Sequence, residues 1–323
     1  MIKHPITSIF FILLLVPATA AAAVFDRAAQ LEVIDAAADV IESRYVDEDK
    51  AHGIAKALRL SEDRWKEPRD GNSFAKEATA FLRSISGDGH LGLSYSEKVI
   101  PQQDGDAVFS AAEMERWYGP QINHGVEKIE RLPGNVILLD LRVFPPPSMA
   151  GDVFAAAMTV AAQGDALIID LRRNGGGAET ANLLTGYLLE GGRPLSGSYN
   201  RPTDTHSYAT SPAWVPGRRF GPTKPVYVLT SHKTFSAAEA VAYDLQALKR
   251  AVIVGETTGG GANPFEYRRV HPHFAVDLPE SRSVNPITGT NWQGTGVKPD
   301  VEVPAEQALD KALELAGEAL KRK

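Results

Sequence analysis

Residues 166–177 read ALIIDLRRNGGG, an apolar run that ends in charged residues and three consecutive glycines. The apolar residues follow one another without alternation, which is typical of a strand buried on both faces. The three glycines precede a helical stretch and indicate a turn with exposed backbone N–H groups, which can bind an anion or an oxyanion. Neither the GxGxxG nor the GxxxxGK[ST] nucleotide pattern is present. A plain strand-to-helix turn explains the same residues equally well.

Similar apolar runs flank this segment on both sides. They cover residues 135–141, 166–171, 226–230 and 252–255, and helical patterns separate them at residues 150–162, 180–189 and 236–249. Alternating buried strands and helices predict an α/β fold with a largely parallel sheet and helices packed outside it. A terminal amphipathic helix is expected from residue 305 onward. We expect residues 135–323 to form this core domain.

The segment before the core reads differently. Apolar residues at Leu31, Ile34, Ala38, Ile41 and Tyr45 share one helical face. Two further helical patterns follow, and the second of them is expected to be capped by the residue at 72 or 73. These patterns predict a helical domain over residues 24–95. Residues 96–134 form a linker with a short helix around 111–117.

The first 23 residues have the pattern of a secretory signal peptide. A basic start at Lys3 precedes the apolar run 9–16, and small residues follow as a cleavage region. The apolar run is too short to span a bilayer. An uncleaved membrane anchor is the alternative. We therefore expect an exported protein, periplasmic or extracellular.

Composition narrows the chemistry. The chain has 323 residues, a net charge of −6 and no cysteine. The lack of cysteine excludes disulfides, thiol catalysis and thiolate metal sites. No Lys/Arg block is present, which argues against nucleic-acid binding. The histidines lack the spacing of a metal site, and no cofactor motif occurs, so we expect neither a metal nor a cofactor.

Residues 231–240, SHKTFSAAEA, place Ser236 after an apolar run and at the start of a helical pattern. With Glu239 three positions on, Ser236 fits a capping box, and spacing alone favours that role. A Ser beyond the end of a parallel strand is also a common position for a nucleophile. The N–H of Ala237 would then face the developing oxyanion. A Ser nucleophile needs a base, and His90, within GDGHLG, stands out because glycine-rich backbone surrounds it.

Six segments together resemble one family. GDGHLGL, GNVILLDLR, DLRRNGGG, TFSAAE, VGETTGGG and NWQGTGVKPD occur in the order seen in the tail-specific (C-terminal-processing) serine peptidases. The chain is most similar to the branch that contains the interphotoreceptor retinoid-binding protein and its bacterial relatives. The resemblance implies a core of ββα units, like that of crotonase and Clp protease, behind an N-terminal helical domain.

The resemblance also implies roles for individual residues. Ser236 matches the nucleophile and His90 the general base, while Gly176 and Ala237 match the oxyanion hole. The implied function is an exported serine peptidase or hydrolase that works by acyl transfer on peptide or protein substrates. The alternative, also suggested by the retinoid-binding relative, is a non-catalytic binder of apolar ligands on the same fold.

Three departures from the family pattern matter. Gly261 stands where tail-specific proteases have the Lys of a Ser–Lys dyad, so a histidine base becomes necessary. Gln293 replaces the Glu that orients the base in this branch; it can fix the tautomer but cannot stabilise an imidazolium by charge. Asp88 or Glu256 are candidates for supplying that charge, although Glu256 equally fits a salt bridge that holds its loop. The third departure concerns the PDZ domain that tail-specific proteases often insert between the histidine loop and the core. The segment between residues 93 and 135 is too short to contain one.

Overall fold

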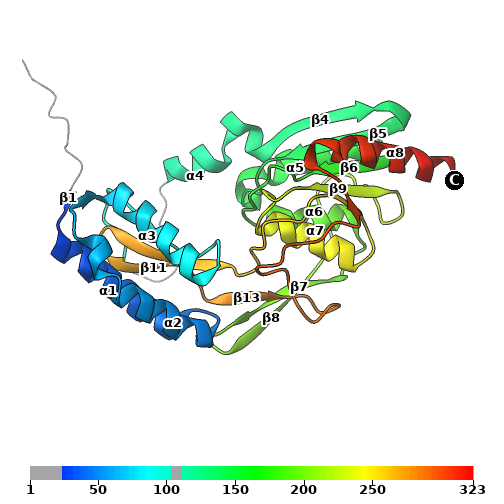
Figure 1. The fold of residues 1–323 in the computed structure, drawn as a ribbon. Coiled ribbons are helices and arrows are strands. Elements are labelled where there is room, and N and C mark those ends of the chain that lie inside the picture. Colours follow the sequence, from blue (N-terminus) through cyan, green and yellow to red (C-terminus); the bar gives the residue numbers. More distant parts are fainter. Residues whose placement is uncertain (1–23, 103–110, 323) are drawn as a thin grey trace, which may run out of the picture.

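The computed structural model describes residues 24–102 and 111–322. The predicted signal peptide lies outside these residues. Among the helices that the structure does describe, none is long and apolar enough to cross a membrane. Figure 1 shows two parts: a smaller one that contains the N-terminal helices and a larger one built around a sheet.

The larger part is organised by a six-stranded sheet with the order β14-β10-β9-β6-β5-β4. All neighbouring strands are parallel except β4, which runs antiparallel to β5. The strands occupy β4 Val126–Leu132, β5 Val136–Leu141, β6 Ala166–Asp170, β9 Val226–Thr230, β10 Val252–Gly255 and β14 Val301–Glu302. The four apolar runs therefore form four neighbouring strands, and the predicted α/β fold class is confirmed.

Helices cover both faces of this sheet (Figure 1). Side chains of a strand alternate between faces, so Ile137 and Leu139 enter one core while Leu138 enters the other. The first core is completed by α5 Pro147–Ala161, α6 Thr180–Leu188 and α7 Ala237–Ala247. The second is completed by α8 Ala308–Lys321, which buries alanines at 308, 312 and 316. The two cores fix which strand ends and helix starts meet.

The smaller part holds α1 Arg27–Arg44, α2 Glu48–Arg59 and α3 Gly71–Ser86. The expected cap of the third helix, at residue 72 or 73, is wrong: Asp70 is the cap, and its Oδ1 accepts from the Ser73 N–H at 3.0 Å. These helices pack on a sheet of the order β11-β12-β3, formed by Phe265–His271, Phe274–Pro279 and Gly92–Tyr95. Two of its three strands thus come from the C-terminal third of the chain.

The remaining elements are short. A third sheet has the order β13-β7-β8, from Ser281–Val284, Pro194–Asn200 and Thr205–Thr210. Helix α4 spans Ala111–Tyr118, within the predicted linker. Two short strands and four 3-10 turns complete the described chain: β1 Val24–Phe25, β2 Arg69–Asp70, η1 Glu62–Trp65, η2 Pro120–Gly125, η3 Pro133–Asn135 and η4 Ala305–Gln307.

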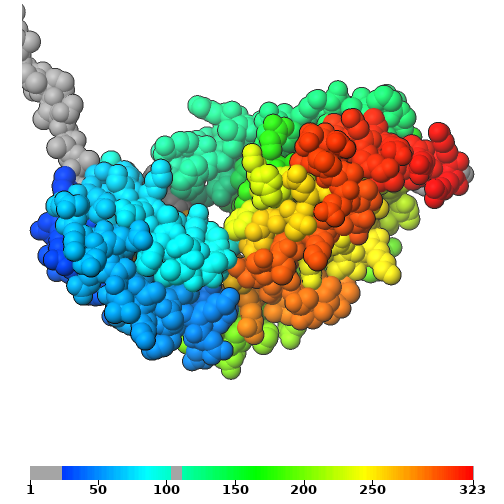
Figure 2. Space-filling view, in the orientation of Figure 1, coloured from blue at the N-terminus to red at the C-terminus, as the bar shows by residue number. Residues whose placement is uncertain are grey.

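One buried carboxylate ties the N-terminal helices to the sheet of the smaller part. Glu280 lies between β12 and β13, and its side chain is 2% exposed. Its carboxylate accepts from Nε and Nη2 of Arg44 in α1, at 2.5 and 3.1 Å. It also accepts from Nε and Nη2 of Arg268 in β11, both at 2.7 Å. Burial acts to raise the pKa of Glu280, but the two guanidinium groups hold it below its usual value. In the space-filling view the N-terminal helices form a lobe set against the rest of the molecule (Figure 2).

Candidate active site

Ser236 lies in a strained turn between β9 and α7. Its φ of 55° and ψ of −123° lie in a region that residues with a side chain rarely adopt. Such strain is typical of functional sites, and a sharp strand-to-helix turn is the usual setting of a nucleophilic Ser. The following residue, Ala237, is the first of α7, where a helix leaves backbone N–H groups without an intrahelical partner.

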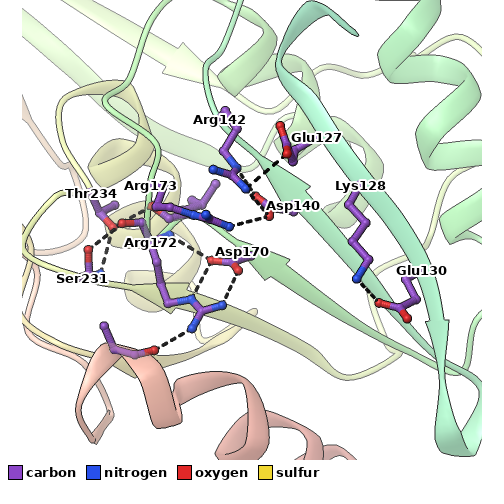
Figure 3. Close-up of polar contacts among 12 residues, drawn as sticks. Glu127, Lys128, Glu130, Asp140, Arg142, Asp170, Arg172, Arg173, Ser231 and Thr234 are labelled. Carbon is purple, nitrogen blue, oxygen red and sulfur yellow. Dashed lines mark hydrogen bonds and ion pairs between the residues drawn. The ribbon is translucent and has the colours of Figure 1, made fainter. Parts of the chain in front are cut away.

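Side-chain hydrogen bonds fasten this turn to the glycine turn after β6. Thr234 Oγ1 donates to the Leu171 carbonyl at 2.8 Å, and Ser231 Oγ donates to the Arg172 carbonyl at 2.6 Å. The Phe235 N–H donates to the carbonyl of Asn174 at 3.1 Å. Figure 3 shows Ser231 and Thr234 against the start of this turn. Two segments 60 residues apart therefore meet because β6 and β9 are neighbours and end at the same edge of the sheet.

The charged residues of the glycine motif shape the turn. Arg172 forms a two-pronged ion pair with Asp170 at 2.9 and 2.6 Å and donates to the Ala305 carbonyl at 2.6 Å. Arg173 reaches Asp140, at the end of β5, at 3.3 Å (Figure 3). Because these carboxylates are already paired with guanidinium groups, they position the backbone of the turn instead of facing Ser236.

The structure places Gly176 directly against Ser236 and Ala237. A Cβ atom on Gly176 would lie 2.7 Å from the Ser236 Cβ and 3.0 Å from the Ala237 nitrogen, and its φ is 105°. The lack of space for a Cβ atom and the positive φ each require glycine at this position. The Gly176 N–H donates to Asn174 Oδ1 at 2.8 Å. The predicted oxyanion residues and the predicted nucleophile therefore share one site.

Glu239 connects Ser236 to a second glycine turn. Its buried carboxylate accepts from the Ser236 N–H at 2.9 Å, from the N–H groups of Gly260 and Gly261 at 2.7 and 2.8 Å, and from the Thr258 hydroxyl. Burial raises the pKa of Glu239, and the four donors oppose that rise. The sequence indicated Glu239 only as the partner in a capping box. Its contacts with residues 258–261 could not be predicted from the sequence, because those residues are distant in the chain.

His90 lies beside the Ser236 turn but does not bind the Ser236 hydroxyl. Its ring is 7% exposed and packs on the ring of Phe235, with centroids 4.7 Å apart, and on Phe265 at 5.7 Å. Among residues 24–102 and 111–322, no hydrogen bond joins His90 to Ser236, and His90 Nδ1 has no hydrogen-bond partner. Burial lowers the pKa of His90, although the charge of Asp88 opposes this.

Asp88 is the carboxylate nearest to His90. Its Oδ1 lies 4.0 Å from His90 Nδ1 and accepts from the His90 N–H at 2.9 Å. Its Oδ2 accepts from the Tyr45 hydroxyl and from Asn263 Nδ2, both at 3.0 Å. Tyr45 and Asn263 were not among the predicted site residues. They hold the His90 loop from α1 and from the segment before β11.

The other two predicted supporting residues lie elsewhere. Gln293 Oε1 accepts from the Ala262 N–H at 2.7 Å, so it supports the glycine turn and is not bound to His90. Glu256 pairs with the exposed His232 at 3.1 Å and accepts from the Ala305 N–H at 3.3 Å. These contacts are those of a salt bridge that holds the loop, the alternative role predicted for Glu256.

The ring of Phe235 occupies a space left by three glycines. A Cβ on Gly89 would lie 2.8 Å from Phe235 Cζ, and one on Gly259 would lie 2.9 Å from its Cδ2. A Cβ on Gly261 would overlap the ring. Any side chain at position 261, including the Lys of a Ser–Lys dyad, thus needs the space that Phe235 fills.

A sequence model of peptidase family S41 matches residues 140–303, which include the glycine motif, Ser236 and Gln293. The chain belongs to this family, and the resemblance to C-terminal-processing peptidases is confirmed.

Solved structures share the fold over nearly the whole chain. A lipoprotein from Streptococcus agalactiae matches with a TM-score of 0.62 at 16% identity, over 90% of this chain and 96% of its own. A putative peptidase from Parabacteroides merdae matches with a TM-score of 0.61 at 16% identity, over 89% and 96%. The photosystem II D1 C-terminal processing protease matches with a TM-score of 0.52 at 16% identity, over 90% and 97%. Identities this low describe the fold alone.

Proposed function

We propose that this protein is an exported serine peptidase with Ser236 as its nucleophile. The observation that carries the proposal is the strained backbone of Ser236, which lies at a helix start with Gly176 and the Ala237 N–H packed around it. A capping Ser does not need a glycine at contact distance or a positive φ. A partly exposed nucleophile between backbone donors explains both features.

The proposed reaction is acyl transfer. Ser236 Oγ attacks the substrate carbonyl and His90 takes its proton. The Ala237 N–H and the Gly176 N–H, once the latter is released from Asn174, stabilise the oxyanion. His90 then protonates the leaving amine, and water hydrolyses the acyl-enzyme.

The His90 role requires a rearrangement, because His90 now contacts Phe235 and not Ser236. Catalytic hydrogen bonds are often long before substrate binds and tighten in the complex. Two features support His90 as the base: its Nδ1 is buried without a hydrogen-bond partner, and its lowered pKa keeps the imidazole neutral. Asp88, 4.0 Å away, supplies the negative charge that Gln293 lacks.

A fluorophosphonate probe tests the nucleophile. We expect the wild-type protein to be labelled once, S236A not to be labelled, and the surface control S84A to label as the wild type does. H90A should label at least about 100-fold more slowly, since general-base help is typically worth that much. Labelling of S236A, or a well-folded wild type that is never labelled, would contradict the proposal and favour a binder of apolar ligands.

Export is tested separately. The intact mass of protein purified from the exporting cell should correspond to a chain that begins shortly after residue 20, as the signal pattern predicts. A chain that retains residue 1 would argue against cleavage.

A further inference from the structure

A cavity of about 390 Å³ opens next to Ser236. Ala237, one of the two proposed oxyanion residues, and Gly177, which follows the other, are part of its lining and lie next to the nucleophile in the chain or in space. The cavity lies between α6, α7 and β7, and Figure 1 shows the two helices side by side. Its apolar wall consists of Ala181, Leu195, Ala209, Ala240, Val241 and Pro264.

Asp244 is a buried residue in the lining of this cavity. It is 5% exposed and accepts from the Ser196 N–H at 3.1 Å, the Ser196 hydroxyl at 2.6 Å and Asn285 Nδ2 at 2.8 Å. All these donors are neutral. Within the described part of the chain, Asp244 forms no ion pair, and burial raises its pKa. An ionised carboxylate without a counter-charge is unfavourable in such a place.

The charged side chains in the described lining of the cavity are all acidic. Among the described residues that line it there is no Lys, Arg or His, and the second charged one is Glu179 at the exposed edge. An incoming cation therefore meets two carboxylates in this lining, Glu179 and Asp244, and no competing cation among its described residues. An apolar side chain would remove water from Asp244 and offer it no partner, which costs binding free energy.

Resting on the proposed function, we propose that this cavity binds the Lys or Arg side chain of a peptide substrate beside the scissile bond. The aliphatic stem packs on the apolar wall, as the stems of long basic side chains do. The cationic group binds Asp244, through charge-assisted hydrogen bonds that are stronger than neutral ones. The protein is on this basis a peptidase that selects basic residues.

The test uses fluorogenic peptides that differ at one residue, immediately before the cleaved bond. Lys and Arg are compared with norleucine, which has the stem without the charge. We expect kcat/KM to be about 10- to 100-fold higher for Lys or Arg. D244N should reduce this preference to about threefold or less, while the exposed control D310N keeps it. Detectable fluorophosphonate labelling of D244N shows that its nucleophile is present, and the comparison uses only the ratio of kcat/KM between the basic and norleucine peptides.

A second measurement needs no variant. Benzylamine should slow fluorophosphonate labelling of the wild type, and benzyl alcohol at the same concentration should not. Equal protection by both compounds, or equal cleavage of Lys and norleucine peptides, overturns the inference. If labelling occurs but the basic preference is absent, only the cavity assignment fails. If the wild type is never labelled, the proposed function fails together with it.

Discussion

At the scale of single residues, Glu239 joins two turns of the proposed active site. Its two carboxylate oxygens accept four hydrogen bonds from Ser236 and from the turn at residues 258–261. The turn that carries the proposed nucleophile and the turn that supports Phe235 are thereby held by one side chain. Removing a partner from a buried network leaves the other donors unsatisfied.

We expect E239Q to lower the free energy of unfolding by about 2–4 kcal/mol, because an amide N–H then faces backbone donors. It should also slow fluorophosphonate labelling of Ser236. Denaturant unfolding measures the first effect. The matched control is E256Q, whose half-exposed ion pair with His232 should contribute less than about 1 kcal/mol. Equal stability of E239Q and E256Q would show that Glu239 does not hold the turns.

The pH dependence of activity follows from the pKa of His90. Burial lowers this pKa below 6.5, so the imidazole stays neutral and able to accept a proton at lower pH. We expect the acid limb of kcat/KM to have its midpoint below pH 6.5. In D88N the midpoint should move further down, because Asp88 acts to raise the His90 pKa. A midpoint that rises in D88N would contradict the proposed role of Asp88.

The sequence could indicate some of these residues and not others. Ser236 and the glycine turn sit in local patterns that a strand end and a helix start impose. The contacts of His90, Gln293 and Glu239 depend on loops brought together from distant parts of the chain. Their partners, such as Phe235, Ala262 and Gly260, could not be predicted from spacing.

At the scale of elements, the interlocking of Phe235 with Gly89, Gly259 and Gly261 sets the spacing of three turns. One comes from the loop before β3, one from the loop after β9 and one from the loop after β10. The aromatic ring fills the room that the missing side chains leave. The same packing places the ring of His90 against Phe235.

We expect G261A to lose about 1–3 kcal/mol of stability, as overpacking of a close-packed site does. F235A should be destabilised too, but the double variant should recover part of the loss, since the ring that the new methyl meets is gone. The control is G53A, where a Cβ meets nothing within 4 Å in a helix, so stability should rise by about 0.5–1 kcal/mol. Thermal unfolding of the four variants gives the comparison. Additive losses in the double variant would show that the two sites do not interact.

Buried strands of the large sheet were predictable because they are continuous apolar runs. The strands of the smaller sheets were not. Residues of β8 are almost all exposed, and β3 is only four residues long. Both depend on partners far away in sequence, so hydrophobic periodicity carries little information about them.

At the scale of the whole molecule, Asp277 lies where the C-terminal third of the chain meets the N-terminal part. It sits on β12 opposite Gly92 of β3 and accepts from Ser94 Oγ at 2.7 Å. Burial raises the pKa of Asp277 from 3.8 to about 6. A raised pKa means that the folded state binds the proton more tightly than the unfolded state, so this stabilisation is present below pH 3.8 and is lost as pH rises through about 6.

We therefore expect D277N, which needs no proton, to unfold at a higher temperature than the wild type at pH 7.5. The gain should reach at most about 3 kcal/mol and should shrink toward pH 4.5. Thermal unfolding at the two pH values measures it, with the exposed D310N as the control. A variant that is less stable than the wild type by the same amount at both pH values would show that the charge of Asp277 carries no penalty.

The helices α1, α2 and α3 bury their apolar faces against Phe274, Val276 and Leu278 of β12. As the ribosome releases the chain from its N-terminus, these helices exist long before the strand that closes their core. The N-terminal helices therefore stay incompletely packed until β12, in the last third of the chain, has been synthesised. This order of synthesis fits the export proposed above, because residues 24–102 cannot complete their core before the last third of the chain is made.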